Sequence, residues 1–203
     1  MGSGVISRRP LRRYGLLKLT LTIALAMVTD ASRSIAGRKA MMTKETAILA
    51  GGCFWGMEDI LRKLPGVLQT EVGYTGGFTP NPQYPQVKTG KTGHAEAIRI
   101  EFDPGKLSYR DLLTTFFRMH NPTTLNQQGN DIGSQYRSAI FFLSEEQRRT
   151  AEEKKREVQA SGKWKNPIVT EIVPAGAFYP AEDYHQDYLV KNPGGYTCHY
   201  LRD

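Results

Sequence analysis

Segments with the two-residue periodicity of β-strands alternate with segments of helical periodicity along most of this chain. Apolar strand patterns are predicted over residues 46–50, 67–74, 95–102, 136–143 and 168–173. Helical patterns are predicted over residues 54–64, 109–120, 145–160 and 181–190. Strands and helices that interleave in this way bury their apolar faces by packing in layers, so the sequence predicts an α/β two-layer sandwich with one sheet.

The net positive charge of the chain lies in its first 44 residues. The chain has 203 residues, with 27 Lys and Arg against 20 Asp and Glu. Nine of the basic side chains but only one of the acidic ones precede residue 45, so the remainder is close to neutral. Nucleic-acid binding needs clustered positive charge on the folded part, so nucleic acid is not an expected partner. We predict a basic extension over residues 1–44 and one domain over residues 45–203.

The extension has the layout of an export signal. An Arg-Arg pair precedes an apolar run over residues 19–28, and the small residues around Ala36 suit cleavage. The run is too short for a bilayer, which needs about 20 residues, so stable membrane insertion is not expected. Alternatively, translation starts at Met41 or Met42 and the extension is never made. The protein is then cytoplasmic, whereas a signal over residues 1–36 would make it periplasmic or exported.

Only two cysteines occur, Cys53 and Cys198. Two thiols cannot build a disulfide-dense scaffold or a four-cysteine zinc site, and no cysteine or histidine pair has ligand spacing, so no metal is predicted. Cys53 follows Gly51 and Gly52, where a buried strand meets a helix. The unpaired N–H groups and positive dipole end of that helix favour a nucleophilic thiolate at Cys53. The alternative is a buried, inert cysteine.

Trp55 lies off the apolar stripe of the helix that begins after Cys53. At about 100° per residue, Phe54, Met57 and Leu61 share one face of that helix. Trp55 instead shares the opposite face with charged residues. An indole beside a candidate nucleophile suits one wall of an apolar substrate pocket. The alternative is burial of Trp55 under a loop.

Glu96 is the one carboxyl group on an apolar strand face. Strand alternation places it with Ile98, Ile100 and Phe102. Burial on that face disfavours the charged form, so the group can stay protonated near neutral pH and act as a general acid. Alternatively, Glu96 lies at a frayed strand end, where His94 or a backbone donor neutralises it.

Cys198 lies in a tail rich in glycine and proline, residues 192–198, which favours a mobile segment. A mobile thiol can condense with a sulfenic acid formed at Cys53, which is the role of a resolving cysteine. Two other classes of protein stay open at this point. One is an exported non-enzymatic domain with a structural Cys53–Cys198 disulfide. The other is a cysteine hydrolase or acyltransferase that pairs Cys53 with His94 or His199.

Five motifs follow one another in the chain: Gly52-Cys53-Phe54-Trp55-Gly56, Gly73-Tyr74-Thr75-Gly76-Gly77, Thr92-Gly93-His94-Ala95-Glu96-Ala97, Gln128-Gly129-Asn130-Asp131 with Gln135-Tyr136-Arg137-Ser138, and Tyr184-His185-Gln186. In this order they resemble the peptide methionine sulfoxide reductase A family. The similarity runs from about Thr46 to Cys198. It implies an α/β (α+β) two-layer sandwich with a ferredoxin-like core of mixed sheet and helices.

The resemblance also implies a reaction. Cys53 would attack the sulfur of the S epimer of methionine sulfoxide, free or in proteins, release methionine and become a sulfenic acid. Phe54 and Trp55 would hold the methyl group of the substrate. Glu96 would donate a proton to the sulfoxide oxygen. Such an oxidoreductase repairs oxidised proteins under oxidative stress.

Further positions of the family complete the implied site. Tyr74 and Tyr136 would hydrogen-bond the sulfoxide oxygen, and Asp131 would order the site. Cys198 would form a redox-active disulfide that thioredoxin, or dithiothreitol in vitro, reduces. Some members have a second recycling cysteine near the C-terminus. This chain has only Cys198 there, so thioredoxin would reduce the Cys53–Cys198 disulfide directly. The resemblance implies no metal or organic cofactor, a monomer is expected, and His185 is predicted to be structural.

Overall fold

The computed structural model describes residues 1–2 and 44–203. The predicted export signal, its apolar run over residues 19–28 and the alternative starts at Met41 and Met42 lie outside the described residues. A compact unit spans Thr43–Asp203. Within the described ranges, no helix is both long enough and apolar enough to cross a membrane.

Six strands form one mixed sheet, which confirms the predicted fold class. In chain order they are β1 (Glu45–Gly51), β2 (Val67–Thr75), β3 (Ala95–Phe102), β6 (Ser138–Phe142), β7 (Glu171–Pro174) and β8 (Phe178–Pro180). The order across the sheet is β7-β6-β1-β3-β2-β8. All neighbouring strands are antiparallel except β6 and β7, which are parallel.

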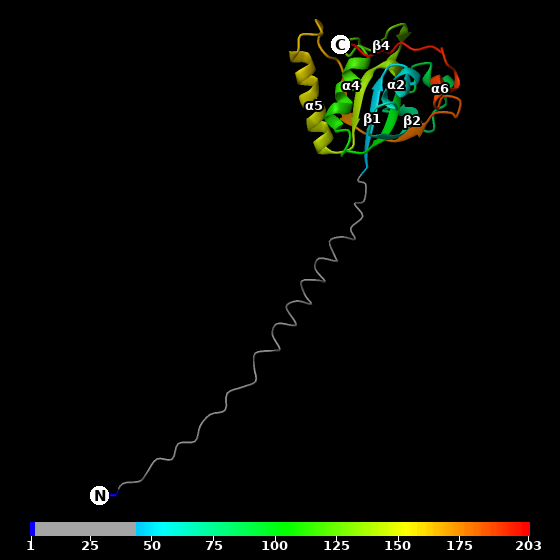
Figure 1. Cartoon of the computed structure of the whole chain (residues 1–203). Coiled ribbons are helices and arrows are strands. Elements are labelled where there is room, and N and C mark those ends of the chain that lie inside the picture. Colours follow the sequence, from blue (N-terminus) through cyan, green and yellow to red (C-terminus); the bar gives the residue numbers. More distant parts are fainter. Residues whose placement is uncertain (3–43) are drawn as a thin grey trace. The chain divides into compact units, whose positions relative to one another are not determined.

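Helices pack around this sheet (Figure 1). The longer ones are α2 (Phe54–Leu61), α4 (Tyr109–Met119) and α5 (Glu145–Ala160), and the short ones are α3 (Tyr84–Val87), α6 (Tyr188–Lys191) and a 3-10 helix at Ser134–Tyr136. A two-stranded hairpin joins β4 (Gln127–Gln128) to β5 (Asp131–Ile132). Figure 1 shows α5 at one side of the unit and α6 at the other.

Both faces of the sheet are buried, because each strand alternates its side chains between two apolar clusters. Leu49 of β1 and Ile98 of β3 belong to the larger cluster, together with side chains of α2 and α4. Ile48 and Ala97, one residue away in each strand, belong to a smaller cluster on the opposite face. Glu96 therefore shares the face that α2 covers, as the alternation predicted.

The predicted elements differ from the observed ones where tertiary hydrogen bonds hold the backbone in another conformation. Residues 181–190 were expected to form one helix, but only Tyr188–Lys191 is helical. The Gln186 side chain accepts a hydrogen bond from Val72 N and donates to Val72 O, both at 2.9 Å, and so ties the preceding residues to β2 in a non-helical path. The predicted strand over 136–143 begins later, because Tyr136 belongs to the 3-10 helix. Neither β8 nor the β4–β5 hairpin was predicted.

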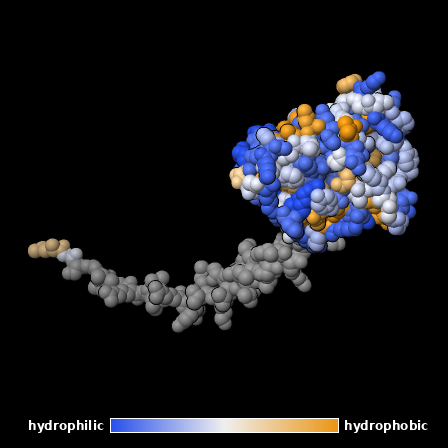
Figure 2. Space-filling view, turned by 90° about the horizontal axis from the view of Figure 1, so that it is seen from above, coloured by the Kyte–Doolittle hydropathy of each residue, from blue (hydrophilic) through white to orange (hydrophobic). Residues whose placement is uncertain are grey.

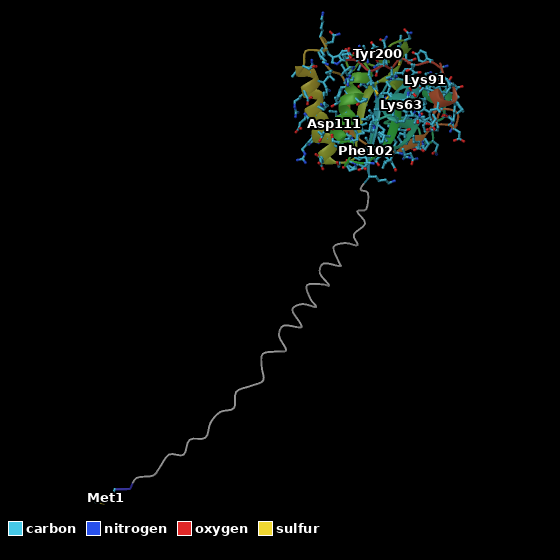
Figure 3. The ribbon with its side chains drawn as sticks, viewed as in Figure 1. Met1, Lys63, Lys91, Phe102, Asp111 and Tyr200 are labelled. Carbon is cyan, nitrogen blue, oxygen red and sulfur yellow. The ribbon has the colours of Figure 1, made fainter. Side chains whose placement is uncertain are left out.

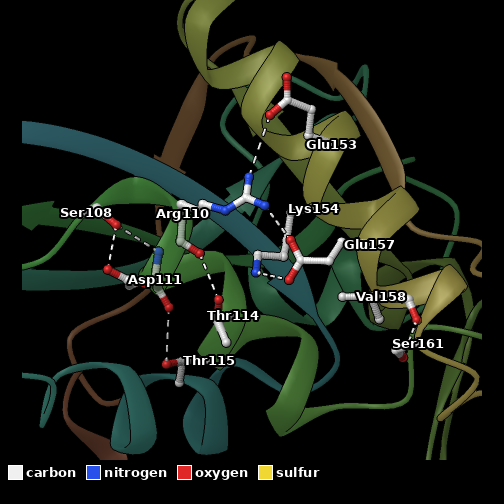
Figure 4. A network of polar contacts seen from close by, with 10 residues as sticks. All are labelled: Ser108, Arg110, Asp111, Thr114, Thr115, Glu153, Lys154, Glu157, Val158 and Ser161. Atoms are coloured by element: carbon white, nitrogen blue, oxygen red, sulfur yellow. Dashed lines mark hydrogen bonds and ion pairs between the residues drawn. The ribbon is translucent and has the colours of Figure 1, made fainter.

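Ion pairs join α4 to α5 on the surface (Figure 4). Arg110 of α4 pairs with Glu153, at 3.6 Å, and with Glu157 of α5. Lys154 also pairs with Glu157, at 2.9 Å. The exposed pairs of Arg110 contribute at most about 1 kcal/mol each. The pair of the buried Lys154 lies within α5 and does not join the two helices. The position of α5 therefore depends more on apolar contacts, such as those of the fully buried Ala151.

One end of the sheet gathers the predicted reactive residues. Tyr200 of the C-terminal tail and Phe102, the last residue of β3, lie at opposite ends of the unit (Figure 3). Since β3 begins at Ala95, Glu96 lies toward the end where the tail runs. The face seen in Figure 2 is mostly hydrophilic, with small separate apolar patches. That face therefore shows no large apolar surface of the kind that marks a binding site.

Candidate active site

Cys53 lies between β1 and α2, where the sequence predicted it. The residue is only 6% exposed and occupies the N-cap position of α2. Gly52 before it has a φ of +113°, and a β carbon there would lie 2.7 Å from Cγ of Gln128. Only glycine tolerates both conditions. The turn before Cys53 therefore lets the β4–β5 hairpin approach the cysteine backbone.

Burial opposes the predicted thiolate in the resting site. Burial raises the pKa of the Cys53 thiol well above its usual range, and at a pH where Glu96 is ionised its charge raises the thiol pKa further. The backbone N–H of Trp55, at the start of α2, lowers this pKa but does not compensate for the loss of water. Cys53 is therefore a protonated thiol at neutral pH, and its proton must leave as the sulfur reacts.

Glu96 lies beside Cys53 in an environment that keeps its carboxyl group neutral. The side chain is 2% exposed, and one carboxyl oxygen accepts a hydrogen bond from Phe54 N at 3.2 Å. Burial raises the pKa of Glu96 to about 8, the Phe54 N–H lowers it, and the charge of Asp131 raises it. Most Glu96 side chains are therefore protonated at neutral pH and have a proton to give.

Tyr74 does not have the free hydroxyl group that its predicted role requires. The residue is fully buried, and its hydroxyl donates to Oε2 of Glu182 at 2.8 Å. The other oxygen of Glu182 accepts from Tyr84 N at 2.8 Å. Tyr74 thus holds Glu182, and Glu182 fixes the start of α3. This hydrogen bond argues against Tyr74 as a donor to the sulfoxide oxygen.

Tyr84 has the surroundings that were predicted for Tyr74, and sequence reasoning missed it. Burial raises the pKa of Tyr84 to about 12, and the charges of Glu96 and Cys53 add to the increase. The phenol therefore shares the electrostatic environment of the thiol and the acid. Its signal in the sequence is weak, because it is one aromatic residue in a loop of proline, asparagine and glutamine. Binding residues are often found on such loops.

Tyr136 and Asp131 belong to the same electrostatic cluster. Burial raises the pKa of Tyr136, and the charges of Glu96 and Tyr84 raise it further. Asp131 in β5 accepts a hydrogen bond from the Tyr196 hydroxyl at 3.1 Å. Its charge raises the pKa values of Cys53 and Glu96. The β4–β5 hairpin and the 3-10 helix thus bring both predicted residues to the thiol.

Aromatic rings surround Trp55 on the other side of α2. The indole stacks on Tyr188 with ring centres 3.7 Å apart, and its N–H donates to Nδ1 of His185 at 3.0 Å. The His185 ring also lies 5.1 Å from the ring of Phe54. His185 therefore holds the two residues that the resemblance assigns to the methyl group of the substrate, which agrees with its predicted structural role.

The C-terminal tail lies on the first turn of α2. A β carbon on Gly56 would lie 2.2 Å from Oγ1 of Thr197 and 2.7 Å from Nδ1 of His199. A β carbon on Gly129 would lie 3.3 Å from Cβ of Cys198. The tail was expected to be mobile, yet these contacts seat Cys198 between α2 and the β4–β5 hairpin.

The contacts of the cysteines do not support the two other classes. Cys53 and Cys198 are both free thiols. His94 accepts from Gly77 N at 3.1 Å and donates to Thr79 O at 2.7 Å, so both nitrogens of its ring are hydrogen-bonded to the backbone. No histidine in the described part of the chain hydrogen-bonds Cys53. Residues 44–203 also contain no cluster of three or more side chains that could hold a metal ion.

Comparison with known proteins agrees with this chemistry. A family model described as peptide methionine sulfoxide reductase matches residues 45–203. Peptide methionine sulfoxide reductase MsrA of Leifsonia xyli subsp. xyli is 60% identical over 158 residues, which cover 78% of this chain and 91% of that protein. MsrA of Pseudomonas fluorescens is 58% identical over 158 residues, covering 78% and 74%.

Solved structures of similar proteins share the fold. Reduced Mxr1 of Saccharomyces cerevisiae is 42% identical with a TM-score of 0.75, covering 79% of this chain and 93% of that one. Methionine sulfoxide reductase A of Corynebacterium diphtheriae is 39% identical with a TM-score of 0.68, covering 78% and 79%. Mxr1 in complex with Trx2 is 28% identical with a TM-score of 0.55, covering 80% and 93%. The chain therefore belongs to the peptide methionine sulfoxide reductase A family and reduces methionine sulfoxide in a thiol-dependent reaction.

Proposed function

We propose that Cys53 reduces the S epimer of methionine sulfoxide, free or in proteins, and that Glu96 supplies the proton for the oxygen. The observation that carries this assignment is the buried pair itself. A thiol at the start of α2 lies beside a carboxyl group whose pKa is raised to about 8, and the Phe54 N–H that this carboxyl accepts belongs to the residue after the cysteine. No metal or organic cofactor takes part in the proposed steps.

The first step transfers one oxygen atom. The Cys53 sulfur attacks the substrate sulfur while Glu96 gives its proton to the sulfoxide oxygen, where negative charge develops. The thiol proton leaves as the new bond forms and restores the acid. The oxygen then moves to the Cys53 sulfur, methionine leaves, and a sulfenic acid remains. Protons and electrons balance without any other reactant.

Tyr84 and Tyr136 are proposed to stabilise the oxygen during this step. Both phenols have pKa values raised by burial and by the charge of Glu96, so both keep their protons at neutral pH and can donate hydrogen bonds. Phe54 and Trp55 form the apolar side, where a methyl group excludes water. Asp131 helps to order the site through its bond to Tyr196.

Substitutions of Tyr84 and Tyr74 by phenylalanine give a matched test of which hydroxyl group binds the oxygen. Tyr84→Phe removes a donor to the developing oxyanion and is expected to lower kcat for methionine sulfoxide about 10- to 100-fold. Tyr74→Phe removes only the bond to Glu182 and is expected to cost about 1–3 kcal/mol of unfolding free energy, with kcat within about threefold of the parent. Steady-state kinetics with dithiothreitol and urea unfolding measure the two effects. The reverse pattern would return the oxygen-binding role to Tyr74.

Cys198 is proposed to resolve the sulfenic acid. Its sulfur attacks that of Cys53, water leaves and a disulfide forms. Thioredoxin, or dithiothreitol in vitro, then reduces the disulfide. The similar yeast protein Mxr1 has a solved structure in complex with Trx2, which supports a protein of the thioredoxin class as the reductant here.

Removing the resolving thiol separates the two reductants. Cys198→Ser is expected to release one methionine per enzyme and then stop with thioredoxin, because no disulfide forms. Turnover with dithiothreitol should continue, since a small thiol can reduce a sulfenic acid directly. Methionine release, followed with each reductant in turn, makes the measurement. Undiminished cycling of the variant with thioredoxin would refute the resolving role.

A further inference from the structure

One buried histidine next to the resolving cysteine has no part in the steps above. His199 is 6% exposed, and its Nε2 lies 2.9 Å from the carbonyl oxygen of Gly51. A carbonyl oxygen can only accept a hydrogen bond, so Nε2 must carry the proton. A neutral imidazole has one N–H, so Nδ1 has a free lone pair. The end of β1 thus fixes the tautomer of this ring.

The free nitrogen faces the thiol of Cys198. The distance from Sγ of Cys198 to Nδ1 of His199 is 3.5 Å, which is within hydrogen-bond range for sulfur. The backbone N–H of His199 also donates to Oγ1 of Thr197 at 3.1 Å, which holds the backbone of this pair in place. The thiol therefore has an acceptor within reach, on a ring that the contact of Nε2 with Gly51 keeps in position.

The resolving step needs such an acceptor. Burial raises the pKa of Cys198 to about 12, and the charge of Asp131 contributes to the increase, so a free thiolate is scarce at neutral pH. Burial also lowers the pKa of His199 to about 4, so the imidazole keeps its lone pair at any cellular pH. The thiol proton must therefore leave while the sulfur attacks, rather than before.

The charges around the ring agree with a neutral imidazole. Arg202 in the tail lowers the pKa of His199, while Asp131 of β5 and the Gly51 carbonyl raise it. His120, which follows α4, faces the same region, and its own pKa is lowered to about 3 by burial, so it is also neutral. Desolvation outweighs these opposing charges, because the ring is almost fully enclosed.

We propose that His199 is the general base of the resolving step. The inference rests on the proposed function, in which Cys198 attacks the sulfenic acid of Cys53. Nδ1 of His199 takes the thiol proton as the S–S bond forms and the S–O bond of Cys53 breaks. The leaving hydroxide takes up the proton that the protonated imidazole then releases, and departs as water, which returns His199 to its neutral form. The sulfenic sulfur is reduced and the Cys198 sulfur is oxidised, so no further reactant is needed.

Asp131 is the competing acceptor near this thiol. One of its oxygens already accepts from the Tyr196 hydroxyl at 3.1 Å. Its charge and a hydrogen bond with the Cys198 side chain both raise the pKa of Cys198, and so hold the thiol in its protonated form. His199 has the contact to Sγ and no second donor on Nδ1 among the described residues. The geometry therefore favours the histidine, and Asp131→Asn becomes an arm of the test.

The test follows the decay of the sulfenic acid. Fully reduced protein is mixed with one equivalent of methionine sulfoxide and no reductant, and the Cys53 sulfenic acid is trapped with dimedone at intervals and measured by mass spectrometry. His199→Gln keeps a donor for the Gly51 carbonyl but cannot take a proton. We expect the sulfenic acid to decay about 100-fold more slowly at pH 7 in this variant. His120→Gln, which removes another buried neutral histidine, is the matched control and should decay as the parent does.

The pH profile separates a base from a structural residue. In the parent, the decay rate should be level above about pH 6 and fall only as His199 becomes protonated. In His199→Gln, the rate should rise about tenfold per pH unit, because the thiol must ionise by itself. A parallel loss at every pH, or a slow decay in Asp131→Asn with the parent profile in His199→Gln, would overturn the role of His199. Absence of any dimedone adduct in Cys198→Ser, which cannot form the disulfide, would instead overturn the proposed function and the inference with it.

Discussion

Replacement of Cys53 by serine is expected to abolish methionine sulfoxide reduction with thioredoxin and with dithiothreitol alike. A serine hydroxyl is a far weaker nucleophile toward sulfur and cannot become a sulfenic acid, so both the attack and the acceptance of oxygen are lost. The decrease in kcat/KM should be at least about 10⁴-fold, which corresponds to roughly 5 kcal/mol of transition-state stabilisation. Methionine release, measured by chromatography with each reductant, gives the result.

Cys198→Ser is the matched control for this loss, because it changes the other thiol by the same atom. Both cysteines are free, so neither substitution breaks a disulfide. The unfolding free energy of Cys53→Ser should therefore stay within about 1–2 kcal/mol of the parent. If Cys53→Ser kept activity with dithiothreitol while remaining folded, another residue would be the nucleophile.

Glu96→Gln is expected to cause the second largest loss, about 10²- to 10⁴-fold in kcat. Glutamine keeps the size of the side chain and can still accept from Phe54 N, which lies 3.2 Å from the carboxyl oxygen. It cannot give up a proton. The variant therefore isolates proton donation from packing, and its kcat for methionine sulfoxide with dithiothreitol measures the contribution of the acid.

The pH dependence of the first step should identify the same group. The pKa of Glu96 is raised to about 8, so the acid has its proton below that pH and loses it above. Single-turnover methionine release by the parent should therefore decrease as pH rises through about 8, whereas Glu96→Gln should lack this decrease. An unchanged profile in the variant would argue against the general-acid role.

The pH dependence of the unfolding free energy gives an independent test of the raised pKa of Glu96. The folded-state pKa is raised from 4.5 to about 8, so the protonated form stabilises the fold at low pH. That stability is lost as pH rises toward the folded value, on the order of 3 kcal/mol between pH 5 and 8. Glu96→Gln should remove this dependence in urea unfolding, apart from the contributions of other groups. Buried Glu58, whose pKa burial also raises, keeps its own contribution in both proteins.

Local pattern was sufficient for the regular elements that carry the core. The predicted strand over 95–102 and helix over 145–160 have the observed bounds. The reason is that their apolar spacing coincides with burial, since alternate residues of β3 face two different clusters. The helix predicted over residues 181–190 is wrong because a hydrogen bond between the Gln186 side chain and β2 decides the path of this segment. No local pattern of residues encodes that bond.

The same distinction applies to the candidate site. Cys53 and Glu96 stood out in the sequence because a thiol at a helix start and a carboxyl on an apolar face are local anomalies. Tyr84 did not, since its nearness to Glu96 depends on the loop before α3 folding back. The sequence motif favours Tyr74 for the oxygen-binding role instead. Only the hydrogen bond from Tyr74 to Glu182 shows that its hydroxyl is occupied.

The sequence by itself determined the layered fold, the position of the candidate nucleophile and the identity of the proposed acid. Tertiary structure decided the protonation of that thiol, because the depth of burial outweighs the helix N-terminus, and burial depends on the hairpin and tail that pack around it. It also decided which tyrosine shares the field of the acid and which histidine faces the second thiol. These choices depend on contacts between residues far apart in the chain, such as His199 with Gly51, and the spacing of residues along a chain does not specify such contacts.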